Sequence, residues 1–258
     1  MRAATVATIQ LESHGRRQMR IPVIRGLIDR RILVNYRADP AVLTKLLPRP
    51  FRAKIIKGVG IAGVCLIRLK DIRPQSFPEV VGLSSENAAH RIAVEWEEQG
   101  RLREGVYIPR RDTSSRLNMV LGGRLFPVIQ HHASFDITEG DGKYHIAIER
   151  DDGQTRVAVE GEVDSVLPAG SVFDSIQEAS AFFENGSVGY SPGGPDEMHG
   201  IELRSFNWKV EPLRVTRVES SFFEDAEIFP KGSVEFDCAL LMRGIAHEWH
   251  AQQSFRVA

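Results

Sequence analysis

The sequence lacks a cysteine framework, a basic excess and a long apolar run, and each absence excludes a class of protein. Its two cysteines, Cys65 and Cys238, stand in apolar runs without a CxxC or Cys/His spacing, which predicts buried free thiols and argues against a zinc site. With 33 basic and 34 acidic residues the formal net charge is −1, so nothing favours nucleic acid as a partner. No apolar segment approaches the roughly 20 residues that span a bilayer. We therefore expect a cytoplasmic protein that binds neither nucleic acid nor a membrane.

Length and composition indicate an ordinary globular chain. Its 258 residues, 42% of them hydrophobic, are enough to bury a substantial core. No repeat, low-complexity tract or linker divides the sequence. We predict a loose N-terminal leader over residues 1–20, which lacks the apolar core of a signal peptide, and a single domain over residues 21–258.

Strand-like alternation dominates the sequence after the leader. Residues 90–97 and 245–257 alternate apolar and polar side chains, as expected of half-buried strands. Short helices are predicted to begin at Pro40 and near Ser175, and the glycine- and proline-rich stretch 189–200 predicts a loop. Many strands with few short helices predict an α+β, mainly β fold: a curved antiparallel sheet or closed β-barrel. The interior of such a barrel commonly holds one small ligand.

Three segments together resemble a known superfamily. They are RRILVNYRADPAVLTKLLPRPF (residues 30–51), LSSENAAHRIAV (83–94) and VLGGRLFPVIQHH (120–132). In this order and spacing they resemble the acetoacetate decarboxylase-like superfamily, and the chain looks closest to an uncharacterised bacterial branch of it. The resemblance covers most of residues 25–137. It implies the fold of that superfamily and an interior pocket for a small ketone, keto acid or other carboxylate.

The resemblance also shows what is missing from the expected site. In the decarboxylases the first of two adjacent lysines forms a Schiff base with the substrate ketone, because a desolvated lysine beside another cation keeps a neutral amine. The lysine pair falls here on His131 and His132, and an imidazole forms no stable iminium with a ketone. The family glutamate matches Glu86, a second falls near Cys65, and a family arginine falls within a residue or so of Arg30. The resemblance therefore implies a retained pocket without the Schiff-base lysine.

Neither another lysine nor a metal offers a substitute for the missing amine. Lys54, Lys57 and Lys70 stand in polar or turn-like settings that predict surface positions. The run His247-Glu248-Trp249-His250 is not the HExxH of a helical zinc site, since on a strand its two histidines face opposite ways. We predict no metal and no cofactor.

Strand parity selects three candidates for the pocket. His131 shares a face with apolar residues, where a histidine can act as general acid or base; the alternative is a core histidine satisfied by a backbone carbonyl. Glu86 is either a pocket carboxylate that pairs with His131 or an arginine, or a loop-edge glutamate in water. His90 has the parity of Glu86 and is either a ligand-binding or a packed side chain.

Two arginines bracket a predicted helix that Asp112 or Thr113 would cap and Gly122-Gly123 would end. Arg116 and Arg124 could clamp a substrate carboxylate in bidentate fashion, and the alternative for each is an exposed surface position. The predicted catalytic residues are therefore His131 and Glu86, and the predicted ligand-binding residues are Arg30, Arg116, Arg124, His90 and Cys65.

The sequence leaves two functions open and does not decide whether the protein is an enzyme. The first is a small-molecule pocket that handles a ketone, keto acid or carboxylate by acid–base or electrostatic catalysis. The second is a non-catalytic binding or interaction module that keeps the barrel as a scaffold. An interior lined by Glu86, His131 and an arginine favours the first, and one filled by aromatic residues such as Trp96, Phe126 and Phe135 favours the second. Strand edges also favour self-association into a homo-oligomer.

Overall fold

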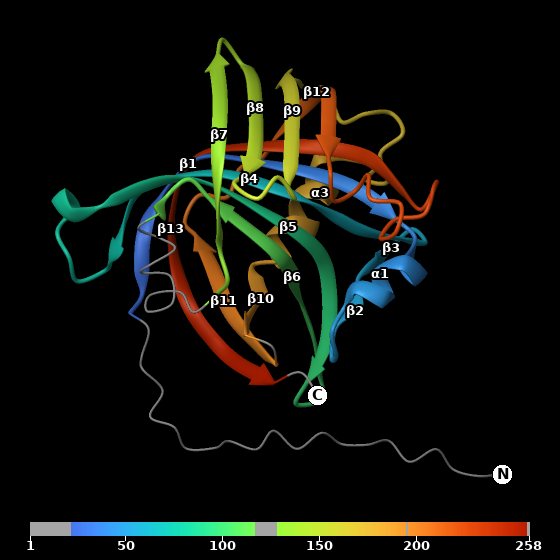
Figure 1. Cartoon of the computed structure of the whole chain (residues 1–258), viewed down its shortest axis with the longest axis horizontal. Helices are drawn as coiled ribbons and strands as arrows, with labels where there is room; N and C mark the ends of the chain where they lie inside the picture. The colour runs from blue at the N-terminus through green and yellow to red at the C-terminus, as the bar shows by residue number, and fades with distance from the viewer. Residues whose placement is uncertain (1–21, 117–127, 195, 257–258) are drawn as a thin grey trace.

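One strongly curved sheet dominates the computed structural model, which describes residues 22–116, 128–194 and 196–256 (Figure 1). The sheet has 13 strands. None of the helices in the described ranges is long and apolar enough to cross a membrane. The elements are β1 (Ile24–Ala38), α1 (Pro40–Leu46), β2 (Arg52–Ala53), β3 (Ile55–Ile56), β4 (Val59–Pro74), the 3-10 helix η1 (Glu79–Val81), β5 (Leu83–Glu98), β6 (Arg101–Thr113), β7 (His131–Gly140), β8 (Lys143–Arg150), β9 (Arg156–Val163), α3 (Ile176–Asn185), β10 (Val188–Gly194), β11 (Glu197–Ser205), β12 (Glu211–Ser220) and β13 (Val234–Arg256).

The sheet closes into two rings that share five neighbouring strands, β13, β1, β4, β5 and β6. The larger ring continues from β6 through β7, β8, β9 and β12 back to β13. The smaller ring continues from β6 through β10 and β11 back to β13. The predicted curved, closed and mainly β fold is confirmed, but the sheet is mixed, because β6 pairs in parallel with both β7 and β10. Residues 114–130 join β6 to β7 and supply the long connection that a parallel pair needs.

The shared strands are buried on both faces, and each face looks into a different ring. In β1, Ile32 and Val34 belong to a core cluster that contains the inward residues of β8 and β9, so this face lines the larger ring. Leu33 points the other way and packs in a second cluster with Phe182 and Phe183 of α3. Residues of β11 and β13 also pack against the second cluster, so this face lines the smaller ring. Alternation along a strand therefore assigns each side chain to one ring or the other.

Both described α-helices begin where the sequence predicts. Asp39 caps α1, since its side chain accepts a hydrogen bond from Ala41 N at 2.7 Å and Pro40 occupies the first turn. Ser175 caps α3 by accepting from Glu178 N at 3.1 Å. The buried side of α3 lies against the smaller-ring face of the shared strands and covers the polar groups described below.

The predicted loop over residues 189–200 is wrong, because these residues form most of the β10–β11 hairpin. Glycine is required inside this hairpin for packing. A Cβ on Gly200 would lie 2.6 Å from Cε1 of Tyr190, whose ring rests on the facing strand. Gly200, one of the glycines that suggested a loop, is therefore a site where a neighbouring side chain approaches closely.

Candidate functional site

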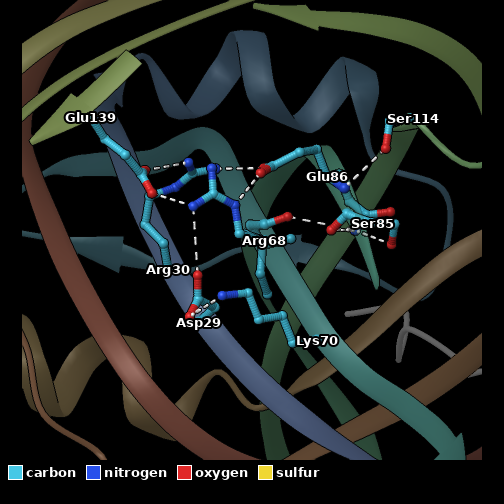
Figure 2. Close-up of polar contacts among 10 residues, drawn as sticks. Asp29, Arg30, Arg68, Lys70, Ser85, Glu86, Ser114 and Glu139 are labelled. Atoms are coloured by element: carbon cyan, nitrogen blue, oxygen red, sulfur yellow. Dashed lines mark hydrogen bonds and ion pairs between the residues drawn. The ribbon is translucent and has the colours of Figure 1, made fainter. Parts of the chain in front are cut away.

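Four charged residues form an ion-pair quartet on the larger-ring face, and Arg68 links it to a further ion pair between Asp29 and Lys70 (Figure 2). Arg30, Arg68 and Glu86 are direct neighbours across β1, β4 and β5. Arg30 donates from Nη2 to Glu86 at 2.6 Å and from Nη1 to Glu139 of β7 at 2.9 Å. Arg68 donates to both of the same glutamates. The structure thus brings together Arg30 and Glu86, two of the residues predicted for the site.

The quartet is electrically balanced and its carboxylates are fully engaged. Two guanidinium groups face two carboxylates, and each carboxylate accepts from both arginines. Burial alone would raise the pKa of Glu139, but hydrogen bonds from Arg30 and Arg68 outweigh it and lower that pKa. Ser114 Oγ also accepts from the backbone N of Glu86 at 3.0 Å. We interpret the quartet as a structural link from β7 to the shared strands.

His131 lies apart from Glu86, at the start of β7. It is the Cα partner of Asp112 of β6 in the parallel register, and burial together with nearby Arg150 lowers its pKa. Asp112 is buried, and neither of its carboxylate oxygens has a hydrogen-bond partner among the described residues. Burial raises the pKa of Asp112 to about 6. The expectation that Asp112 caps a helix is therefore wrong, because the residue belongs to β6 and its carboxylate oxygens accept no hydrogen bond among the described residues.

The remaining predicted residues are scattered. His90 is fully buried in the larger ring against Phe222, and its Nε2 lies 3.4 Å from Ser220 Oγ. Burial lowers the pKa of His90 to about 3, so its ring is neutral at physiological pH. Arg116 is exposed. Arg124 lies outside the described residues, as does most of the helix predicted to follow Thr113.

A second polar group, the arginine cluster, lies on the smaller-ring face and consists of Arg31, Arg91 and Arg111 around Cys65. Arg31 Nε donates to Cys65 Sγ at 3.2 Å. Arg91 and Arg111 both interact electrostatically with the Cys65 sulfur. Cys65 is the Cα partner of Leu33 and of Ala89, which places it on the opposite face from Glu86. Of the predicted set, Cys65 alone belongs to this cluster.

The arginine cluster holds positive charge without a matching carboxylate. No ion pair among the described residues includes Arg31, Arg91 or Arg111; Arg91 donates to the Asn35 amide oxygen and Arg111 Nε to Ser191 Oγ at 2.8 Å. Arg91 is only 3% exposed, and its Nε has no partner within the described ranges. Burial lowers the pKa of Arg91 and of Arg111 to about 10. Burying a charge without a partner is costly, so this arrangement favours an anion.

A small cavity opens beside two of these arginines. It measures about 30 Å³, the space that roughly two water molecules need. Arg31 and Arg91 line it together with Lys54, Glu104 and Phe183. The Arg91 guanidinium stacks 4.8 Å from the centre of the Phe183 ring, which fixes its plane. A carboxylate group is of suitable size and charge for this space.

Lys54 departs from its predicted surface position. Its side chain is 17% exposed, its ammonium lies 4.3 Å from the centre of the Phe182 ring, and it lines the cavity. The same ammonium is paired with Glu104. Lys54 is therefore a cation at the rim of the arginine cluster, held by a carboxylate of its own.

His247 is a buried polar residue on the same face, but further along the sheet, since it pairs with Gly26 whereas Cys65 pairs with Leu33. Neither of its ring nitrogens has a hydrogen-bond partner among the described side chains. Burial lowers the pKa of His247 to about 4, although a backbone hydrogen bond with Ile245 raises it, and Arg31 lowers it further. His250 faces elsewhere and lies 3.1 Å from Glu248. The described part of the chain contains no group of three His, Cys, Asp or Glu residues placed to hold a metal ion.

Sequence reasoning missed Arg31, Arg91 and Arg111, and only Arg91 carried a signal. Arg91 stands between Ala89 and Ala93 on one face of β5, and a charged residue inside a doubly buried strand is unusual. Arg31 and Arg111 each follow another arginine, so their sequence context is that of an exposed charge pair. What the sequence does not supply is the register across β1, β4, β5 and β6. That register places the three arginines and Cys65 on one face of neighbouring strands.

Comparison with solved structures identifies the fold defined by the two rings as that of acetoacetate decarboxylase-like proteins. An acetoacetate decarboxylase from Legionella pneumophila subsp. pneumophila str. Philadelphia 1 superposes with a TM-score of 0.60 at 10% identity over 99% of this chain and 98% of its own. An acetoacetate decarboxylase-like enzyme from Sphingomonas wittichii RW1 gives 0.58 at 12% identity over 92% and 93%. The enduracididine biosynthesis enzyme MppR, complexed with pyruvate, gives 0.54 at 13% identity over 99% of both chains.

The chain belongs to the DUF2071 family, described as "Uncharacterized conserved protein", whose model matches residues 28–244. No curated protein sequence matches it significantly. The family match shows membership of DUF2071, and the structural matches show a fold like that of acetoacetate decarboxylase-like proteins.

Proposed function

We propose that the protein binds a small organic acid, a keto acid or another carboxylate, inside the smaller ring, and that the arginine cluster holds the carboxylate. The observation that carries this proposal is the group of three arginines with no described carboxylate partner. A guanidinium presents two parallel N–H groups that match the two oxygens of a carboxylate. Bound in a site screened from water, such a ligand offsets the charge that the apo protein leaves uncompensated.

Among carboxylates, a keto acid is favoured by the ligand of one protein with a similar fold. One structural relative, MppR, carries pyruvate in its complex. At 13% identity this likeness concerns the fold, so it supports the ligand class without assigning it. The cavity beside Arg31 and Arg91 suits the carboxylate end of such a molecule.

We further propose that the protein is not a Schiff-base decarboxylase. Lys54 is the lysine that lines the cavity, and Glu104 engages its ammonium. An amine must be neutral to attack a ketone, and the decarboxylase mechanism achieves this by desolvation beside a second cation without a carboxylate partner. Chemistry at this site would instead use electrostatic stabilisation by the arginines.

The residues first predicted for catalysis have other roles in this proposal. Both carboxylate oxygens of Glu86 already accept hydrogen bonds, one from Arg30 and one from Arg68, so Glu86 is not the partner of His131 in this proposal. The quartet is therefore proposed to fix the shared strands on whose opposite face the arginine cluster lies. A cytoplasmic location and self-association stay predictions from the sequence.

A thermal-shift screen tests the proposal. Pyruvate, acetoacetate and 2-oxoglutarate are compared with the uncharged pyruvamide and acetone, because a ligand that binds the folded state raises its melting temperature. Carboxylates should raise the melting temperature of the wild type, and the uncharged compounds should not. Arg91→Gln should abolish the shift, while the matched variant of an exposed arginine, Arg101→Gln, should retain it. Equal shifts from pyruvate and pyruvamide would refute carboxylate recognition.

A non-catalytic scaffold is the second candidate, and the filling of the larger ring favours it. Tyr36 stacks on Phe223 with ring centroids 4.2 Å apart, and Phe222 and Phe229 pack around them. These aromatic side chains occupy the part of the ring interior where a ligand would lie. A wild-type protein that binds none of the carboxylates in the screen would favour this second function.

A further inference from the structure

Cys65 occupies the centre of the arginine cluster and differs from an ordinary core cysteine. It is 6% exposed, and its sulfur accepts a hydrogen bond from Arg31 Nε at 3.2 Å. Arg91 and Arg111 are close enough to interact with its charge. The cysteine sulfur is a nucleophilic atom, and here it accepts a hydrogen bond from a guanidinium group.

Cys238 provides an internal contrast on β13, which is separated from the Cys65 strand β4 by β1. It is completely buried, and Asn35 Nδ2 lies 3.5 Å from its sulfur. Burial, followed by the charge of Asp237, raises the pKa of Cys238 to about 12. Cys238 therefore remains a thiol under all physiological conditions, and no arginine donates to it among the described residues.

Independent observations around Cys65 indicate a ligand. The Nε of Arg91 is buried and has no partner in the described part of the chain, and Arg91 lines the cavity. Small residues surround the sulfur, since Gly63 precedes it by two positions on the same face and Ala89 lies opposite it in β5. Arg31 connects the cavity to the nucleophile, because it lines the cavity and donates to the Cys65 sulfur.

We propose that Cys65 is the nucleophile of this site and adds reversibly to the carbonyl carbon of the bound keto acid. This inference rests on the proposed function, in which the arginine cluster holds the carboxylate. The sulfur forms a bond to the carbonyl carbon, the π electron pair of the C=O bond moves to the oxygen, and the proton of the thiol ends on that oxygen. The product is a hemithioketal, and its formation needs no oxidant, reductant or metal.

A hemithioketal and an iminium differ in whether they can promote loss of carbon dioxide. A hemithioketal carbon is tetrahedral and carries no positive charge, so it provides no electron sink for loss of carbon dioxide. The adduct would hold the keto acid by two anchors, the sulfur at the carbonyl carbon and the guanidinium groups at the carboxylate. The chemistry therefore fits recognition or a change at the carbonyl, and not decarboxylation.

Competitive alkylation of the folded wild-type protein tests the nucleophile. Iodoacetate carries a carboxylate and iodoacetamide does not, and peptide mass spectrometry distinguishes Cys65 from Cys238. The rate ratio of iodoacetate to iodoacetamide at Cys65 should exceed that of the urea-unfolded chain by about tenfold, because charge-assisted hydrogen bonds guide the anion. Cys238 should react with neither reagent. A ratio at Cys65 equal to that of the unfolded chain would overturn the inference.

Variants assign the preference to the arginines. Arg91→Gln should return the rate ratio at Cys65 to the value of the unfolded chain, and Arg101→Gln should leave it unchanged. Circular dichroism confirms that each variant is folded. A preference that survives Arg91→Gln would separate Cys65 from the arginine cluster and contradict the assignment.

Carbon-13 spectra of pyruvate labelled at its carbonyl carbon test the addition itself. Wild-type protein should produce a signal in the tetrahedral range beyond that of the hydrate of free pyruvate, and Cys65→Ser and Cys65→Ala should not. A wild-type protein whose melting temperature rises with pyruvate but which forms no adduct would overturn the nucleophile and leave the proposed function intact. Absence of any shift with pyruvate or another carboxylate would overturn both.

Discussion

Arg30 and Arg31 are adjacent in β1, yet their guanidinium groups enter different rings. Arg30 binds two glutamates in the larger ring, whereas Arg31 donates to a cysteine in the smaller ring. The first arginine is neutralised within the fold and the second is not. Strand alternation alone produces this division, and it separates a structural ion-pair group from a group that favours an anion.

Removal of Glu86 should destabilise the fold without affecting carboxylate binding. Glu86→Ala leaves the nearly buried Arg30 with Glu139 as its remaining carboxylate partner, and we expect a loss of about 2 kcal/mol of unfolding free energy. Urea denaturation measures the loss, with the exposed Glu97→Ala as the matched control. A stable Glu86→Ala protein that no longer binds pyruvate would instead place Glu86 in the binding site.

Arg91 should stabilise the complex and destabilise the apo protein. In Arg91→Met an unpaired buried charge is replaced by an apolar chain of similar length, and we expect the apo variant to gain about 1 kcal/mol of stability. The same variant should lose its thermal response to pyruvate. If Arg91→Met were less stable than the wild type by several kcal/mol, Arg91 would have a partner that satisfies its charge within the protein.

Asp112 should lower stability as pH rises through the acidic range. Its pKa is about 6 in the folded state and near 4 in an unfolded chain, so the folded state binds more protons between these values. Stability contributed by the protonated form is therefore lost between about pH 4 and 6. Asp112→Asn should remove this loss and be more stable than the wild type by about 1–2 kcal/mol at pH 7. Equal stability of the two proteins at pH 7 would show that Asp112 is solvated or paired.

His247 should act in the opposite direction. Burial lowers its pKa to about 4, below the value of about 6.5 in an unfolded chain, so the unfolded state binds more protons in between. Stability should therefore fall as the pH decreases through this window. His247→Gln should reduce the slope of unfolding free energy against pH by about one proton between pH 4.5 and 6. An unchanged slope would show that His247 does not titrate with this shift.

Gly63 should be irreplaceable because it lies against the backbone of β1. A Cβ at this position would lie 2.2 Å from the carbonyl oxygen of Val34, which cannot rotate away. Gly63→Ala should therefore cost about 2–3 kcal/mol of unfolding free energy, as overpacked cores do. Gly170→Ala, where nothing lies within 4 Å of the new atom, is the matched control.

The fold was largely predictable from the sequence, and the site was predictable only in part. Period-two patterns and the caps of α1 and α3 are local signals, so the mainly β architecture follows from them. The prediction of a loop over residues 189–200 was wrong because glycine occurs both in loops and in strands where another group approaches closely. At Gly200 that group is the Tyr190 ring, and this contact is known only once the two strands are paired. Arg30 and Glu86 were predicted together, and they do meet.

The arginine cluster could not be predicted because it depends on register and ring closure. Cys65, Arg91 and Arg111 come from three strands, and a shift of one residue in any pairing would move its side chain to the other ring. The surface position predicted for Lys54 failed for the same reason. Its neighbour in space, Phe182, comes from α3, more than a hundred residues later in the chain.

Calorimetric titration of the wild type with pyruvate and with pyruvamide tests the central claim most directly. The two compounds have nearly the same shape and differ in the charge that the arginine cluster would bind. The account predicts saturable binding of pyruvate, no measurable binding of pyruvamide, and loss of pyruvate binding in Arg91→Gln. Binding of both compounds with similar affinity, or pyruvate binding that is unchanged in Arg91→Gln, would contradict it.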